Sequence, residues 1–187
     1  MKSTLVILIS FFNCISFGQT QLKTKIDSLK YTTNIASICR SENVMQKCEL
    51  CNACGDVFFW EIVQAKDSAI PILLDKIIDT TQTKAPIQFA GINYTVGDVA
   101  LLALMEIIHD IPLLDIINTK HSSREAPMFI WKHLNQSLVN RKQFADTLRS
   151  WYNTHQNKLI WSPSNDFEIC DCSGPHPNGG HYTLSED

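Results

Sequence analysis

The sequence predicts an all-α protein, a short α-solenoid of paired helices with an irregular, cysteine-containing C-terminal tail. Three observations support this prediction. A phrase made of Gly-Asp-Val, an apolar run and an Ile-Pro step occurs twice. Apolar residues recur at helical spacing through most of the chain. Proline and glycine concentrate after residue 162, where they prevent a regular helix.

Residues 1–18 are expected to form an export signal. Lys2 provides a short positive region and residues 5–17 are mostly apolar. The small residues Ser16 and Gly18 lie three and one positions before a cut at Gln19. The apolar run is too short to span a bilayer, so we expect a periplasmic or secreted protein with no membrane insertion after cleavage. We predict one helical domain over residues 19–161 and an irregular tail over 162–187.

The first expected helix covers residues 20–40, with Leu22, Ile26 and Leu29 on one face. A polar, cysteine-rich connection follows over 41–54. The first copy of the phrase then runs from Gly55 to Asp75. Its Asp56 is expected to cap a helix, and Pro71 is expected in the first turn of the next helix. Residues 80–94 are expected to be a long connection without strands.

The second copy runs from Gly97 to Asp115. Thr95 is the expected N-cap, with Asp98 completing a capping box. The helix over 99–109 is apolar on nearly every side, which predicts a central, buried position. A partner helix is expected from Pro112 to Ile117. Two further helices, over 126–137 and 140–160, are predicted to close the stack.

The two copies are offset by 42 residues at Gly55 and Gly97, and by 41 residues at Pro71 and Pro112. A period of about 40 residues with two helices per copy is typical of HEAT-type repeats. Residues 55–79 and 97–118 therefore resemble the HEAT-like family. The resemblance implies a scaffold or binding surface and provides no catalytic residue.

Once the signal and its Cys14 are removed, six cysteines remain: Cys39, Cys48, Cys51, Cys54, Cys170 and Cys172. An even number in an exported chain favours disulfides, although the sequence does not determine the pairing. The alternative is a zinc site or a thiol-redox site. Its candidate ligands are Cys48, Cys51, Cys54, Cys170, Cys172, His176 and His181.

Glu106 and His109 have the Glu-x-x-His spacing of di-iron bundles, but the chain contains no second such pair. We therefore expect His109 to lie near the negative C-terminal end of its helix. The four tryptophans are expected to pack between helices. No common nucleophile, metalloprotease or nucleotide-binding motif is present, so no enzymatic activity is expected.

The expected mature chain has 15 basic and 19 acidic residues. This mildly acidic balance, without a basic cluster, argues against nucleic acid as a partner. The function predicted from the sequence is an exported, disulfide-stabilised helical scaffold that binds a protein and needs no cofactor. The alternative is a secreted zinc-binding or thiol-redox protein, and the oligomeric state is left open.

Overall fold

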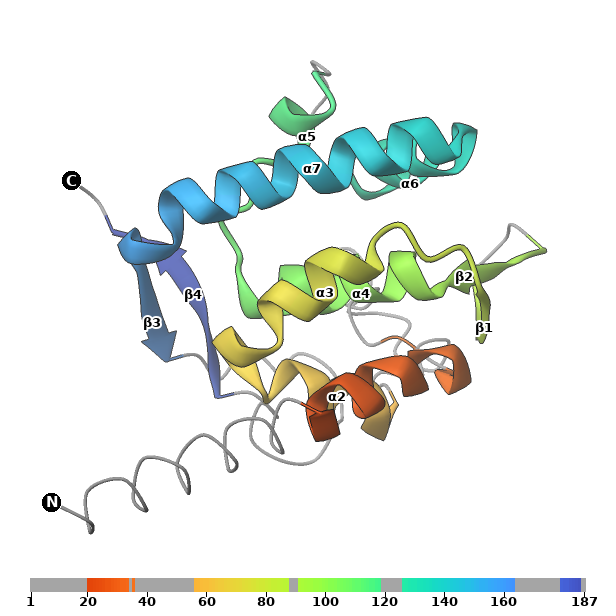
Figure 1. Ribbon diagram of the computed structural model, residues 1–187, viewed down its shortest axis with the longest axis horizontal. Helices are drawn as coiled ribbons and strands as arrows, with labels where there is room; N and C mark the ends of the chain where they lie inside the picture. Colours follow the sequence, from red (N-terminus) through yellow and green to blue (C-terminus); the bar gives the residue numbers. More distant parts are fainter. Residues whose placement is uncertain are drawn as a thin grey trace, which may run out of the picture.

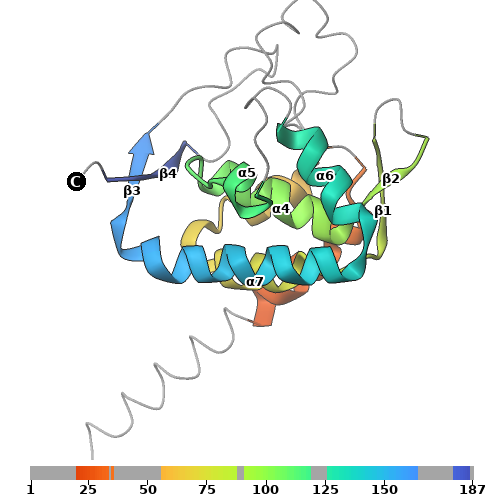
Figure 2. The same cartoon turned by 90° about the horizontal axis from the view of Figure 1, so that it is seen from above.

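The computed structural model describes residues 20–33, 35, 56–87, 91–118, 126–163 and 179–185. Over these ranges the protein is mostly helical, with two small antiparallel sheets of two strands each. The two sheets lie at opposite ends of the molecule, with the helices between them (Figures 1 and 2). The predicted helical character is confirmed, whereas the prediction of a chain without strands is wrong.

The N-terminal helix covers 20–27 and continues into the 3-10 helix η1 (Ser28–Tyr31). Ile26 and Leu29 are fully buried and Leu22 packs against the core, as predicted. Asp56 caps α2 (Val57–Val63) by accepting a hydrogen bond from the Phe58 amide. The same carboxylate accepts hydrogen bonds from the amide and hydroxyl of Thr33, which ties α2 to the N-terminal segment.

The two copies of the phrase have the same order of elements. In the first copy, α2 is followed by η4 (Lys66–Ser68) and α3 (Ile70–Lys76), which has Pro71 in its first turn. In the second copy, α4 (Val96–Ile107) is followed by α5 (Leu113–Ile116), directly after Pro112. The copies differ at Gly-Asp-Val, because Asp56 precedes its helix whereas Asp98 lies inside α4.

Helix α4 is the central helix, as its composition predicts. Thr95 and Asp98 form the expected capping box, and ten of the helix's twelve residues are buried. The helix ends at Ile107, two residues earlier than predicted, because Ile108 takes an extended conformation. Towards the C-terminus of the chain, α6 (Ala126–Gln136) and α7 (Leu138–His155) are the two further helices expected there, followed by the 3-10 helix η5 (Gln156–Lys158).

The expected connection over 80–94 contains two strands, β1 (Gln82–Pro86) and β2 (Asn93–Thr95), paired antiparallel. Burial alternates along β1, where Thr83 and Ala85 are the inward residues. The Thr83 hydroxyl donates to the carbonyl of Tyr94 at 2.8 Å. Because the inward side chains are small or polar, the sequence has no apolar alternation that would indicate a strand.

The second sheet pairs β3 (Leu159–Pro163) with β4 (Gly180–Leu184). The predicted helix over 140–160 is therefore too long, since α7 ends at His155. The predicted irregular tail also contains a strand. Because the partners of this sheet are far apart in the sequence, the local pattern of each strand gives only a weak signal.

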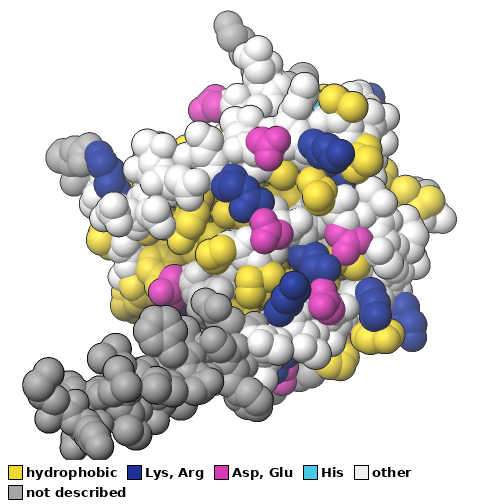
Figure 3. Space-filling model, viewed as in Figure 1, with side chains coloured by type: hydrophobic (Ala, Val, Ile, Leu, Met, Phe, Trp, Pro, Cys, Tyr) yellow, Lys and Arg dark blue, Asp and Glu magenta, His cyan; other side chains and the backbone are white. Residues whose placement is uncertain are grey.

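The elements form layers around α4. In Figure 1, α7 lies above α3 and α4, while α2 and the N-terminal helix lie below them. Surface ion pairs connect successive layers, Arg149 with Asp75 and Lys76 with Asp27, and a third pair, Lys25 with Glu61, joins the N-terminal helix to α2. On the face in Figure 3, charged side chains of both signs alternate with small hydrophobic areas.

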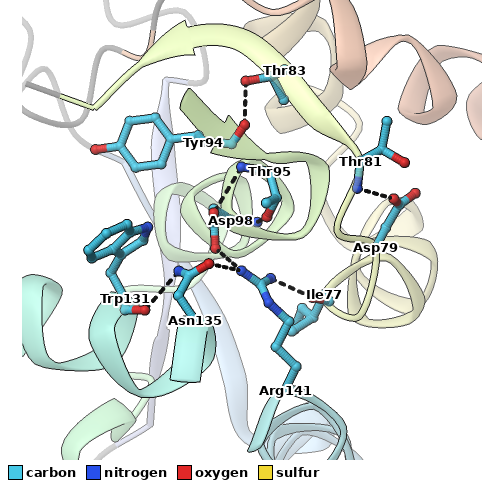
Figure 4. A network of polar contacts seen from close by, with 10 residues as sticks. All are labelled: Ile77, Asp79, Thr81, Thr83, Tyr94, Thr95, Asp98, Trp131, Asn135 and Arg141. Carbon is cyan, nitrogen blue, oxygen red and sulfur yellow. Dashed lines mark hydrogen bonds and ion pairs between the residues drawn. The ribbon is translucent and has the colours of Figure 1, made fainter. Parts of the chain in front are cut away.

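One ion pair is buried within the fold (Figure 4). Arg141 of α7 is 1% exposed and its guanidinium contacts Asp98 of α4 at 2.6 Å. It also donates hydrogen bonds to the Ile77 carbonyl at 3.0 Å and to the Asn135 side chain at 3.2 Å. The other carboxylate oxygen of Asp98 accepts from the Thr95 amide, so the ion pair continues into the capping box.

Gly97 makes room for this network. A Cβ atom at this position would clash with the Ile77 carbonyl and would lie 2.7 Å from the Arg141 guanidinium. The Gly97 amide also donates to the Asp79 carbonyl at 2.8 Å. The glycine of the second phrase therefore allows the end of α3 to approach the start of α4.

We predict that Arg141→Met lowers the free energy of unfolding by about 3–5 kcal/mol, because it leaves the Asp98 carboxylate buried without its cation. The matched control is Arg149→Met, which removes an ion pair that is largely exposed to solvent. We expect the control to lower the free energy of unfolding by less than about 1 kcal/mol. Urea unfolding of both variants measures the difference, and equal small losses would contradict the assigned role of Arg141.

Candidate functional site

The six cysteines of the predicted disulfide or metal site, together with His176, lie outside the described residues. His181 is the one predicted ligand that the structure places, and it lies in β4. The candidate site is therefore built around the β3–β4 sheet. The C-terminal end of α4 lies at the same end of the molecule.

Residues 108–110 extend the sheet beside β4. Ile108 forms a parallel bridge with Tyr182, and the His109 amide donates to the Tyr182 carbonyl at 3.1 Å. The Leu184 amide donates to the Asp110 carboxylate at 2.8 Å. Strand β4 is thus held between β3 on one side and the segment after α4 on the other.

Side chains alternate between the two faces of this sheet. Trp161 and Tyr182 are opposite each other in the register and share one face, as does the buried Ile108. Ser162 and His181 are the next opposite pair and share the other face. The two faces carry different chemistry, aromatic on one and imidazole on the other.

On the imidazole face, His109 and His181 form a stacked pair, which we call the histidine pair. Their ring centroids are 3.4 Å apart and the ring planes differ by 14°. Both side chains are partly exposed. His109 follows the end of α4 as expected, but it lies beyond the helix and after the extended Ile108, so Glu106 and His109 do not share a helical face. Glu106 is instead a buried residue of the last turn of α4.

On the other face, Trp161, Tyr182 and Tyr152 form what we call the aromatic cluster. The rings of Trp161 and Tyr182 meet edge to face, with centroids 5.1 Å apart. The ammonium group of Lys66 lies over the Trp161 ring, 3.7 Å from its centroid, which is a cation–π contact. Tyr152 comes from the C-terminal half of α7 and packs against the core together with Tyr182.

Lys66 reaches Trp161 from a strained backbone. Its φ angle is 52°, in the left-handed region that residues other than glycine seldom adopt. Lys66 is the first residue of η4, and Asp67 follows it. The strained residue therefore occurs at the point where η4 faces the aromatic cluster.

Burial and charge act on the two tyrosines of the cluster. Burial raises the pKa of Tyr152, and the carboxylate of Asp67 and the neighbouring Tyr182 raise it further. Burial also raises the pKa of Tyr182, with a second contribution from Asp67. Both phenols are therefore neutral hydrogen-bonding groups at physiological pH.

Chemically, the site offers one exposed aromatic surface and one pair of imidazoles. Within the described part of the chain, no group of three or more His, Cys, Asp or Glu side chains is arranged to hold a metal ion. Among the helices in these ranges, none has the length and apolar character needed to cross a bilayer.

Sequence reasoning missed Lys66, Asp67 and the special position of Trp161. It assigned all four tryptophans to helix packing, but Trp161 lies in β3, opposite Tyr182. A usable signal was the alternation of Leu159 and Trp161 on one side and Tyr182 and Leu184 on the other. It was weak, because each run has only two large apolar side chains on that face.

No protein-family model matches the chain, and comparisons with curated proteins and with solved structures found no match.

We predict that Asp67→Asn lowers the pKa of both Tyr152 and Tyr182, because it removes the negative charge and leaves the contribution of burial. A tyrosine whose pKa is raised by folding binds its proton more tightly in the folded state. Its contribution to stability is complete below the unfolded pKa of about 10 and is lost as the pH rises through the folded value. An ultraviolet titration of tyrosinate measures the shift. Asp75→Asn, at an exposed carboxylate on α3, is the control and should leave the curve unchanged.

Proposed function

We propose that the protein is an exported, non-catalytic helical module that binds a protein partner through the aromatic cluster and Lys66. The observation that carries this proposal is the position of Trp161. Among the described side chains, Tyr152 and Tyr182 pack against the hydrophobic core, whereas Trp161 does not. Trp161 is partly exposed and is held by Tyr182 and Lys66 instead.

A tryptophan held in this way suits a binding surface. Trp, Tyr and Arg are enriched among the residues that contribute most to protein interfaces. A ring that is already fixed loses little conformational freedom on binding, which favours affinity. Lys66 and Asp67 supply charges at the rim of the aromatic surface. The occupant suggested by this chemistry is a protein segment with apolar side chains flanked by polar ones.

The proposed history of the fold is a duplicated, HEAT-like pair of helices. Each copy contains a helix, a short connection and a second helix with a proline at or just before its first turn. This common order supports descent from one unit, with residues 126–160 covering the stack and the aromatic cluster added at one end. In this proposal α4 is the enlarged first helix of the second unit.

We predict that Trp161→Ala abolishes capture of the partner while leaving the fold intact, because Trp161 lies outside the core. The measurement is affinity capture of the tagged chain from its native cells after mild cross-linking, followed by titration of the purified partner. Ile78→Ala is the matched control, since Ile78 is an apolar residue at the end of α3 that is 42% exposed. The proposal predicts at least a tenfold weaker Kd for Trp161→Ala, about 1.4 kcal/mol or more, and no change for Ile78→Ala. Equal binding by both variants, or no specific partner, would refute it.

We also propose that the six cysteines Cys39, Cys48, Cys51, Cys54, Cys170 and Cys172 form three disulfides after removal of residues 1–18. The intact mass under denaturing, alkylating conditions should then be that of residues 19–187 minus the hydrogens of three disulfides, with no thiol labelled. Cysteines that become labelled and a metal released on denaturation would instead support the zinc or thiol-redox alternative. A mass that retains residues 1–18 would contradict export by signal cleavage.

A further inference from the structure

The histidine pair brings together residues from two distant parts of the chain. His109 follows α4 and His181 lies in β4, and their rings stack at a centroid distance of 3.4 Å. The backbone around both residues is fixed by the Ile108–Tyr182 bridge and by the hydrogen bond from the His109 amide to the Tyr182 carbonyl. The two imidazoles are therefore held close together by the sheet itself.

We propose that His109 and His181 form a two-histidine site for a late first-row divalent cation such as Zn²⁺ or Ni²⁺. Imidazole nitrogen is a preferred ligand of these ions. Two nitrogens bound at about 2.0–2.1 Å and at a tetrahedral angle lie about 3.4 Å apart. The stacking shows that the two side chains reach the same place, and their in-plane lone pairs meet at one ion once the rings turn out of the stack.

Binding requires each ring to rotate until its lone pair points to the shared ion. Both side chains are partly exposed, so this rotation takes place at the surface of the molecule. Water completes the coordination shell, because the described residues provide no third ligand at this position. The ion connects the end of α4 to β4, so it stabilises the attachment of the β3–β4 sheet and raises the melting temperature.

The site is independent of the proposed protein-binding surface. The histidine pair lies on the face of the sheet that carries Ser162, whereas Trp161 and Tyr182 lie on the other face. Loss of metal binding therefore leaves the Trp161 proposal intact. Failure to find a protein partner likewise leaves the metal proposal intact.

The test is calorimetric titration of the full chain with ZnCl₂ and with NiCl₂, after alkylation of any free thiols so that they do not contribute. His109→Phe and His181→Phe keep an aromatic ring in the stack but remove the ligating nitrogens. We expect the wild-type chain to bind one equivalent and each variant to bind at least tenfold more weakly. His155→Phe is the control, because His155 stacks on Trp151 in α7 and should keep wild-type affinity.

Melting of the metal-free variants shows whether they are folded. If a variant does not fold, the site is tested instead in the wild-type chain, by the broadening of imidazole NMR resonances that paramagnetic Ni²⁺ causes. The imidazole resonances of His109 and His181 should broaden before those of His133 and His155. No binding by the wild-type chain, undiminished binding by folded phenylalanine variants, or broadening that starts at His133 or His155 would overturn the proposal.

Discussion

A guanidinium group buried between helices needs an acceptor for most of its donors, because each one left unsatisfied in the interior costs free energy. Arg141 meets this requirement with Asp98, the Ile77 carbonyl and Asn135, which belong to or adjoin three other helices. The Asn135 amide in turn donates to the Trp131 carbonyl. One side chain thus connects α3, α4, α6 and α7, and these helices cannot shift independently without breaking its contacts.

This constraint explains details that otherwise look unrelated. Position 97 has to be glycine, since a side chain there would occupy the space of the Ile77 carbonyl and the Arg141 guanidinium. Asp98 serves the helix cap with one carboxylate oxygen and the ion pair with the other. With its N-terminus fixed in this way, α4 delivers Ile108 and His109 to β4 at its other end.

Local chemistry made the helices predictable. Asp56, Thr95 and Pro71 mark helix starts through short-range hydrogen bonds or a fixed φ angle, and all three positions are as predicted. The strands could not be predicted from local residues in this way. Strand β1 buries only Thr83 and Ala85, so it shows no alternation of apolar and polar residues in the sequence. Strand β3 pairs with residues that lie seventeen or more positions away in the chain. The last predicted helix, over 140–160, was too long because η5 and the start of β3 follow α7 within that range.

The candidate site could be predicted only in fragments. His181 was recognised as a possible ligand and His109 as a residue near a helix end, but nothing local indicates that they stack, because the contact depends on where β4 docks against the end of α4. The cation–π contact of Lys66 with Trp161 depends in the same way on a left-handed residue and on a strand that pairs with a remote partner.

Two backbone features determine why Trp161 lies at the surface of the sheet and not in the core. Gly180 has a φ angle of 149°, and a Cβ atom there would clash with the Ser162 carbonyl and would lie 3.0 Å from the Trp161 ring. The missing side chain therefore lets β3 and β4 approach closely, with the indole beside Gly180. On its other side, the left-handed conformation of Lys66 brings an ammonium group over the ring. Both features thus fix the indole without burying it in the core, and a fixed, partly exposed indole next to a strained residue is the basis of the binding role proposed for Trp161.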